Sequence, residues 1–570
     1  MRAATAAAVA LVACLVVALV AVPLVNLGRI ATDEGLAGIW RALSGPGAKP
    51  AVLHTVVVAG LVTVLAVAAG TALALAIERR PARSRRRSRL LLAGPLVIPE
   101  FVLGFAWSQA YGPAGLSDHL TGLTIPGLFG PAGIVAVLTV YGLPLAYLAV
   151  TAGLAARNDP ALERAARAGG ASAWTTLRTV TLPLLRIPLL GAAALVFVTT
   201  ASSFAVPEVL GTPAGFATMS TLVYTDLALS ATPAAFTELT VVALAMVVLV
   251  LLALGPLDLW LARLAPSARA QTPPALATQR TKADRAVTVI VWAYAIFAAG
   301  IPMLTVILTA LTRGPGEAPV PRNWTLANFQ AGFSGGAGLA LARSAALALA
   351  AAVLAPLLGS LVAGLARGRW RGPLATVVTL AYAIPGSALA VGIIIGYGRW
   401  LDGTAAIILL AYVAKFWVLG HRPVQAALDR LPPDLTRAAR LAGASPATAA
   451  RTVVLPPLSV ALYTAAGLVF VFAFHELTMS TILYGPGTET FAVVIMNQQD
   501  LGGVGATAAL SIVLTAPVVT VAALAAHLTR RPGSPAADPT ALNSIYPERA
   551  VVSAPANSPQ APWPNGPWPR

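Results

Sequence analysis

The polar side chains that interrupt the apolar runs of this sequence form a repeated pattern. Ser202 and Ser203 stand near the end of one apolar run, and His475 and Glu476 stand 273 residues later at the matching place of another. Polar and ionisable groups inside a bilayer are costly and mark solute or ion pathways by default. These pairs therefore predict a polar ring that lines a path for a charged or chelated solute. Hydrogen bonding between helices is the other interpretation of the same residues.

Two more charged residues lie within apolar runs. Glu100 follows a proline, where a helix is expected to break, and is a candidate either for the same path or for a structural role. Lys415 is expected to be structural, with its ammonium drawn to an interface or paired with an acid. No metal site is predicted, because the adjacent His475 and Glu476 do not share one face of a helix and no other ligand cluster has a usable spacing.

The elements that carry these residues are membrane spans. The chain has 570 residues, of which 57% are hydrophobic and 10% charged, whereas soluble proteins carry about 25% charged residues. A helix needs about 20 apolar residues to span the hydrocarbon core. Such runs are found near 5–27, 52–77, 90–111, 132–155, 187–207, 239–262, 286–311, 341–365, 374–397, 405–425, 459–480 and 506–528. The sequence therefore predicts an all-α integral membrane protein with about twelve transmembrane helices.

Charge in the short loops predicts the orientation of these spans. Arginines crowd 78–89 and recur in 367–372, and basic short loops stay on the cytoplasmic side of a membrane. Counting spans from these loops places both termini in the cytoplasm. The net charge of +17 is thus assigned to orientation in the bilayer, and nucleic acid is excluded as a partner.

One basic, Ala-rich segment occurs twice between spans. RAARAGGASAWTTLRTVTLP runs over 164–183 and RAARLAGASPATAARTVVLP over 437–456, and 13 of their 20 positions are identical. Together with the polar pairs at the same offset, this repeat predicts two six-span halves in parallel orientation. The domains expected are 1–262, a linker at 263–285, the second half at 286–529, and a Pro-rich, disordered cytoplasmic tail at 530–570.

Within each copy the spacing predicts a helix, a turn and a second helix. A pair of Ala residues offers a small-faced surface, a Gly four residues later suits a turn with positive φ, and a Leu-Pro pair is suited to begin the next helix. The positions are Ala165, Ala166, Gly170, Val180, Leu182 and Pro183 in the first copy, and Ala438, Ala439, Gly443, Val453, Leu455 and Pro456 in the second. An ordinary basic amphipathic helix is the plainer alternative, but it does not explain the same spacing twice.

This spacing, Ala-Ala-x3-Gly-x9-Val-x-Leu-Pro, resembles the EAA signature of the permease subunits of ATP-binding-cassette (ABC) importers of type I. The doubled form is similar to the fused permeases of the ferric-iron, thiamine and aminoalkylphosphonate group, over most of the chain. The phrases FAVPEVLG, WTLANF and HELTMSTILYGPGTETFAVVI add to the resemblance. One feature departs from it: the signature Glu falls at Arg164 and Arg437, with Glu163 one residue earlier in the first copy and Thr436 in the second.

The resemblance implies how the chain would work. Each copy would be a coupling helix that docks into one of two ABC ATPase subunits, and the halves would rock between inward-facing and outward-facing states. A solute-binding protein would deliver cargo from outside the cytoplasmic (inner) membrane, and Glu208 is a candidate to contact it. ATP would be hydrolysed by the separate subunits, since the chain has no GxxxxGK[ST] loop. The chain itself is therefore expected to be no enzyme and to hold no cofactor.

The cargo implied by this resemblance is iron(III), with thiamine, aminoethylphosphonate and polyamine as alternatives. A secondary transporter driven by an ion gradient is the competing function. Such a transporter would need no paired cytoplasmic docking segments, and it would use membrane-embedded acids such as Glu100 and Glu476 to couple ions.

Overall fold

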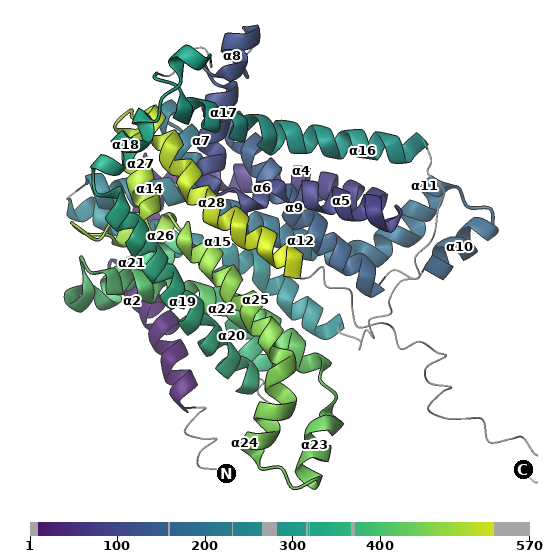
Figure 1. Ribbon diagram of the computed structural model, residues 1–570. Helices are drawn as coiled ribbons and strands as arrows, with labels where there is room; N and C mark the ends of the chain where they lie inside the picture. Colours follow the sequence, from purple (N-terminus) through teal and green to yellow (C-terminus); the bar gives the residue numbers. More distant parts are fainter. Residues whose placement is uncertain are drawn as a thin grey trace, which may run out of the picture. The chain divides into compact units, whose positions relative to one another are not determined.

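The computed structural model describes residues 10–122, 124–157, 160–230, 232–264, 282–314, 317, 320–365 and 371–528. Met1–Ala522 form one compact unit. Within the described residues the chain is helical, with one isolated bridge between Thr312 and Trp324 and no longer β-strand (Figure 1). The expected all-α class is therefore confirmed. The expected tail at 530–570, and most of the expected linker at 263–285, lie outside the described residues.

Among the described residues, ten helices, or eleven if one bent pair is taken as a single span, are long and apolar enough to cross a bilayer. The ten are Ala10–Ala31, Ala48–Glu78, Pro131–Ala155, Ala173–Ala201, Pro233–Gly255, Asp284–Leu311, Ala337–Leu365, Ala405–Arg430, Ala447–Phe474 and Val504–Leu524. The bent pair is Leu374–Ala383 with Gly386–Leu401, which meet at 99°. The expectation of twelve uninterrupted spans is corrected on this point.

The expected and the observed spans differ most in the third span of each half, which is broken at an Ile-Pro pair. In the first half α6 (Gly94–Val97) stops before Pro99 and α7 (Glu100–Tyr111) starts after it; in the second, α20 (Arg371–Ala383) and α21 (Gly386–Leu401) flank Pro385. Both prolines have extended ψ values, 138° and 142°. Proline disfavours helical geometry in the residue before it and donates no amide hydrogen, so the helix ends there.

Three long helices form the centre of each half. They are α4 (Ala48–Glu78), α9 (Pro131–Arg157) and α12 (Leu182–Ala201) in the first half, and α19 (Ala337–Leu365), α22 (Ala405–Arg430) and α25 (Leu455–Phe474) in the second. Glycine permits the closest approach: a Cβ on Gly70 would lie 3.1 Å from the Leu143 carbonyl oxygen, and one on Gly359 would lie 2.7 Å from that of Trp417. Small residues at helix contacts are the usual packing device inside membranes.

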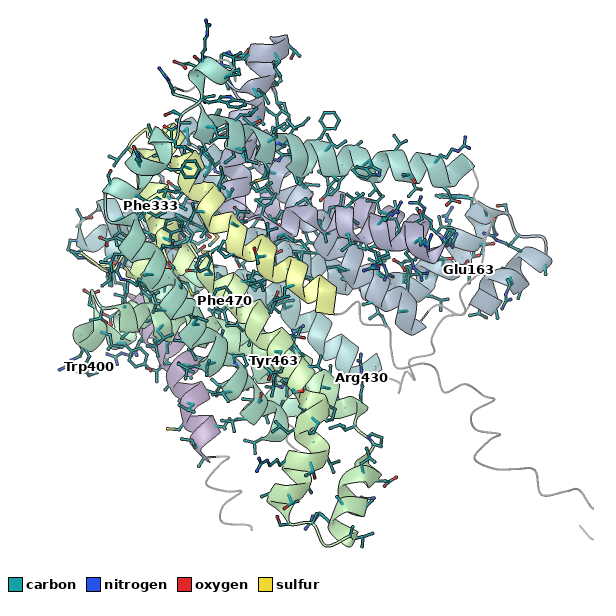
Figure 2. All side chains as sticks on the ribbon, in the orientation of Figure 1. Glu163, Phe333, Trp400, Arg430, Tyr463 and Phe470 are labelled. Atoms are coloured by element: carbon teal, nitrogen blue, oxygen red, sulfur yellow. The ribbon has the colours of Figure 1, made fainter. Side chains whose placement is uncertain are left out.

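The outer faces of these helices are apolar. On α19 the side chains of Leu349, Val353 and Leu357 are exposed, whereas Ala348 and Ala351 on the opposite face are buried. Figure 2 shows the same outward display along α25, where Tyr463 is labelled. A helix that is hydrophobic on every face fits a lipid surrounding.

In the part of the chain that the structure describes, four π-helical turns occur in the spans, and each ends two residues before a proline. They are η1 (Val17–Ala21) before Pro23, η2 (Leu177–Thr181) before Pro183, η4 (Ile296–Gly300) before Pro302 and η7 (Ala450–Val454) before Pro456. In each, the residue just before the proline donates its N–H five residues back instead of four. The proline ring would clash with the carbonyl of residue i−4 in a regular helix, and the wider turn relieves that clash.

The first span of each half packs against the third span of the other half. Helix α2 (Val22–Ala31) contacts α21, and α17 (Ile301–Leu311), which continues α16 (Lys282–Ala295), contacts α7. The Tyr111 hydroxyl donates to the Phe297 carbonyl at 2.7 Å, and the Tyr397 hydroxyl donates to the Ala18 carbonyl. Both acceptors lie in π turns, where the altered ladder leaves carbonyls free. The two halves thus exchange equivalent helices.

The remaining helices complete the spans or connect them. They are α3 (Gly35–Leu43), α5 (Ala82–Leu92), α8 (Leu116–Thr121), α10 (Pro160–Ala168), α11 (Ala173–Thr176), α13 (Ala205–Leu210), α14 (Met219–Leu229), α15 (Pro233–Leu264), α18 (Ala327–Ser334), α23 (Pro433–Leu441), α24 (Pro446–Ala449), α26 (Thr478–Leu483), α27 (Phe491–Asp500), α28 (Val504–Leu528) and the 3-10 turns η3 (Thr212–Ala214) and η5 (Pro321–Asn323).

Candidate functional site

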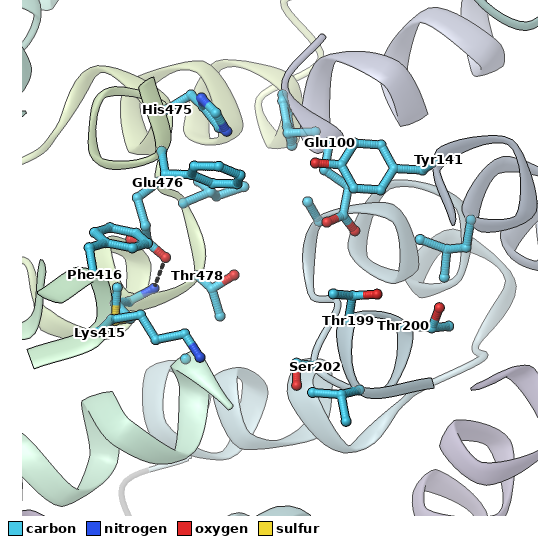
Figure 3. Close-up of a pocket in the computed structure, with 18 of the residues that line it drawn as sticks. Glu100, Tyr141, Thr199, Thr200, Ser202, Lys415, Phe416, His475, Glu476 and Thr478 are labelled. Atoms are coloured by element: carbon cyan, nitrogen blue, oxygen red, sulfur yellow. Dashed lines mark hydrogen bonds between the residues drawn. The ribbon is translucent and has the colours of Figure 1, made fainter. Parts of the chain in front are cut away.

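A cavity of about 260 Å3 lies between the two halves (Figure 3). Both halves supply polar side chains to its wall: Glu100, Tyr141, Thr199, Thr200 and Ser202 from the first, and Tyr382, Lys415, His475, Glu476 and Thr478 from the second. Four of the five expected pathway residues, Glu100, Ser202, His475 and Glu476, therefore share one cavity. Ser203, the fifth, is not part of the lining but contacts Glu100.

The two polar pairs mark the places where the fifth spans end. Helix α12 stops at Ala201 and α13 starts at Ala205, while α25 stops at Phe474 and α26 starts at Thr478. The expected spans at 187–207 and 459–480 continued through these breaks and are corrected. The pairs lie at helix breaks, where exposed backbone groups need hydrogen-bond partners.

Glu476 fills that need in the second half. Its carboxylate accepts the backbone N–H groups of Met479 (2.8 Å) and Ser480 (3.0 Å), and the Ser480 hydroxyl at 2.9 Å. A carboxylate at the start of a helix satisfies its free N–H groups and opposes the positive end of its dipole. Glu476 therefore acts as the cap of α26.

In the first half Glu100, which belongs to α7, caps the start of α13 in the same way. Its carboxylate accepts the Ser203 hydroxyl and the backbone N–H of Val206, in the first turn of α13. At the 273-residue offset Ser203 matches Glu476, and Val206 matches Met479. The Ile-Pro pairs align Glu100 with Gly386. Each half thus brings one carboxylate to the same backbone position, from the third span in one case and from the fifth-span break in the other.

Lys415 is a cavity residue that sequence reasoning assigned only a structural function. Its ammonium donates to the carbonyl oxygens of Tyr382, at 3.3 Å, and Ile384, at the broken end of α20. Gly70 and Gly359 approach equivalent residues of α9 and α22, Leu143 and Trp417. When the two helices are aligned on these contacts, Tyr141 takes the position equivalent to Lys415, and both residues line the cavity. The sequence did offer a signal: Lys415 is the one lysine inside a span predicted from the sequence, since Lys49 and Lys282 lie outside those ranges.

Several cavity groups have no partner within the fold. The Ser202 hydroxyl oxygen is buried without a hydrogen bond among the described residues, whereas the His475 imidazole interacts with the Val471 backbone. Thr200 is 8% exposed, and its hydroxyl also has no partner in the described part of the chain. Buried polar groups are nearly always satisfied, so these two hydroxyl groups are available to a solute or to water.

Glu208 lies outside the cavity lining. It belongs to α13, and its carboxylate accepts the Thr212 hydroxyl at 3.1 Å in the turn that follows. The structure therefore separates it from the four lining residues.

The repeated segments form two hairpins with matching turns. In the first, Gly170 has φ +86°, and the N–H of Ala171 donates to the Ala166 carbonyl at 3.0 Å; in the second, Gly443 has φ +88°, and Ala444 donates to Ala439 at 3.0 Å. This six-to-one bond with a left-handed glycine is a Schellman turn, which ends a helix and reverses the chain. The predicted helix and turn are present at both places.

The second helix of each hairpin begins at a serine cap. Ser172 accepts the N–H of Thr175 and Ser445 accepts that of Thr448, both at 3.1 Å. Each helix then continues through η2 or η7 into the fifth span. Leu182 and Leu455 thus follow a π turn and do not begin a new helix, which corrects that part of the expectation. The second helix of each hairpin and the fifth span that follows it thus form one continuous helix.

The outer surfaces of the hairpins are similar but not identical. Both expose a leucine at the same offset, Leu162 and Leu435. The first hairpin also exposes Trp174 (68%) and the second Leu441 (91%). Glu163, labelled in Figure 2, turns inward: its carboxylate accepts Arg79 Nη2 at 3.0 Å and the Thr181 hydroxyl at 2.7 Å, which ties the first hairpin to α4 and η2.

The chain is similar to known membrane transport components. A probable ABC transporter permease protein of Sinorhizobium fredii is 26% identical over 500 residues, covering 83% of this chain and 85% of that protein. The putative 2-aminoethylphosphonate transport system permease protein of Salmonella paratyphi A is 32% identical over 146 residues, which is 25% of this chain and just over half, 55%, of that relative. The molybdenum transport system permease protein of Mycobacterium bovis is 33% identical over 187 residues, 32% of this chain and 69% of that protein.

A family model extends these likenesses to both halves. The model of the binding-protein-dependent transport system inner membrane component matches twice, at residues 66–270 and 355–533. The two matches each contain one hairpin and one side of the cavity. The expected duplication is therefore confirmed, and the chain belongs to the family of binding-protein-dependent transport system inner membrane components, with the family domain present twice in one polypeptide.

Proposed function

We propose that this chain is the permease of an ABC importer, with both permease halves fused. Two ATPase subunits dock on the two hairpins from the cytoplasm and hydrolyse ATP, which drives the halves between inward-facing and outward-facing states. A solute-binding protein delivers a small solute from outside the inner membrane, and the cavity between the halves is where that solute crosses. Both chain termini lie in the cytoplasm.

The pair of equivalent hairpins carries this proposal. They share the Schellman turn, the serine cap and the π turn although 273 residues separate them. A symmetric ATPase dimer offers two equal docking sites, so two hairpins are needed. Their exposed Trp174 and Leu441 suit docking, because a partner that covers large exposed apolar side chains removes them from water.

The structure weakens the support that the two cavity acids gave to a transporter driven by an ion gradient. Glu100 and Glu476 each accept helix N–H and serine hydroxyl groups. This gives both carboxylates a structural function that needs no coupling ion. A gradient-driven transporter also gives no reason for the matched hairpins.

Two observations bear on the identity of the cargo, and they point to chemically different solutes. The fused form and the phrase FHELTMSTILYGPG favoured iron(III). Two relatives are named for 2-aminoethylphosphonate and molybdenum transport. Uptake of labelled iron(III), molybdate and 2-aminoethylphosphonate by cells that express the full transport system separates these candidates.

The first test is co-purification of an ATPase with the tagged chain in mild detergent. Gly170→Glu together with Gly443→Glu should abolish co-purification and ATP-driven uptake, because both turns require positive φ and the hairpins could no longer dock. Gly122→Glu with Gly502→Glu is the matched control, since both glycines also have positive φ and open surroundings but lie on the other side of the predicted membrane.

The control pair should retain the ATPase. Normal ATPase recovery with the hairpin variant would reject docking at the hairpins. A chain that recovers no ATPase and moves solute on an ion gradient would instead support the secondary transporter.

A further inference from the structure

Lys415 is a charge at the cavity that no opposite charge neutralises by direct contact. Its ammonium donates to two neutral carbonyls, and an ammonium has three N–H donors. In the part of the chain that the structure describes, no ion pair within 4.0 Å includes Lys415. Glu476 acts on it only through space. One donor of a cationic group is thus available to whatever enters the cavity.

The two cavity carboxylates are occupied by the fold. Glu476 accepts two backbone N–H groups and one hydroxyl from α26. Glu100 accepts the Ser203 hydroxyl and one backbone N–H from α13. The positive ends of these helices offset the carboxylate charges. Because both carboxylates already have partners in the fold, neither is left over to pair with a cationic cargo.

Other donors face the same space. The hydroxyl of Thr200 has no partner among the described residues, and Ser202 presents one unbonded polar atom there. Helix α21 also begins at the cavity wall, and it has no side-chain cap and no acidic residue in its first turn. Free N–H groups at a helix start attract anions, which adds to the effect of Lys415.

We propose that the cavity holds a solute through an oxyanion group, of the phosphonate or phosphate type, with Lys415 as its charge partner and Thr200 as a hydroxyl donor. This rests on the proposed function of the cavity as the crossing place. The cavity volume of about 260 Å3 suits a small solute. An uncomplexed metal cation would meet the Lys415 ammonium and is disfavoured.

The test is calorimetric titration of the purified full chain in lipid nanodiscs with three probes. Methylphosphonate carries the anion alone, 2-aminoethylphosphonate carries an anion and an ammonium, and ethylamine carries the ammonium alone. Both phosphonates should bind and ethylamine should not. Lys415→Gln should weaken phosphonate binding by about tenfold or more, because a charge-assisted hydrogen bond is lost. Lys415→Arg should restore binding to within about threefold.

Two controls separate ligand binding from structure. Lys49→Gln removes an exposed lysine outside the cavity and should leave binding unchanged. Lys415 also holds the end of α20, so the Lys415→Gln variant is checked by its melting temperature. If it does not fold, Thr200→Val decides. The Thr200 hydroxyl has no other partner among the described residues, so this variant should keep its melting temperature and bind phosphonate about three- to tenfold more weakly.

The outcomes distinguish this inference from the proposed function. A folded chain that binds neither phosphonate, binds ethylamine instead, or binds phosphonate equally well in the Lys415→Gln and Lys49→Gln variants would overturn the oxyanion site. ATPase docking is measured on the same nanodiscs. Docking without phosphonate binding rejects only the oxyanion site, whereas phosphonate binding without docking rejects the importer.

Discussion

One carboxylate closes the break beside the cavity in each half, but the two carboxylates come from different positions. Glu476 caps its own short helix, while Glu100 reaches across from the third span to Val206. Sequence reasoning found both acids, because an ionisable group in an apolar run is rare. It missed their shared capping function, because the N–H groups that they satisfy are backbone groups and leave no mark in the sequence.

At the scale of residues, we predict the effect of moving the carboxylate from position 100 to position 203. Glu100→Ala should lower the stability of the purified chain by about 1–2 kcal/mol, because Val206 and Ser203 lose their acceptor. Adding Ser203→Glu should recover part of this loss by placing the acid where the second half has it. The recovery should be incomplete, because Pro207 has no N–H to match that of Ser480.

Thermal unfolding in detergent measures this series. Ser202→Ala serves as the control, since the Ser202 hydroxyl has no partner in the described structure and its loss should change little. A Glu100→Ala chain as stable as the parent, or a double variant less stable than the single one, would contradict the capping assignment.

At the scale of elements, helices were predictable and their interruptions were not. Long apolar runs predict spans reliably, but a proline inside such a run can bend, widen or break the helix. Pro99 and Pro385 break it, whereas Pro183 and Pro456 follow a π turn and leave it continuous. The tertiary surroundings decide, because a break is stable only where other groups satisfy the freed backbone.

The π turns of the first spans give an element-scale prediction. Tyr111→Phe and Tyr397→Phe each remove a hydroxyl that bonds a π-turn carbonyl. Each should lower stability by about 1 kcal/mol, and the double variant by the sum, since distant sites add. Melting temperatures of the four chains test this. Tyr463→Phe is the control, as Tyr463 is exposed; equal losses for all three tyrosines would contradict a specific function of these bonds.

At the scale of the whole molecule, the duplication was visible in the sequence but the exchange of first spans was not. The hairpins repeat at a fixed offset, so two halves follow directly. The contact of α2 with α21 joins apolar surfaces that have no distinctive pattern, and any span would present a similar face. Only the packing of the folded chain selects the partner.

This exchange predicts the behaviour of a divided chain. Cut between 264 and 282 and expressed together, the two halves should co-purify through a tag on either one, because each holds the first span of the other. The first half expressed alone should be recovered poorly, since α7 would lack α17 and the Trp107 indole would lose its bond to the Ala298 carbonyl. Stable, separately purified halves would contradict the exchange.

The exchange of first spans between the halves also affects the order in which contacts can form during synthesis. The Ala18 carbonyl meets the Tyr397 hydroxyl 379 residues later, and at about 5–20 residues per second the ribosome needs roughly 20 to 75 s to supply that partner. The first span must therefore wait in the bilayer without its final neighbour until most of the chain has been made. An insertion machinery that shields early spans would protect this nascent chain during the interval in which it is most exposed to wrong helix pairing.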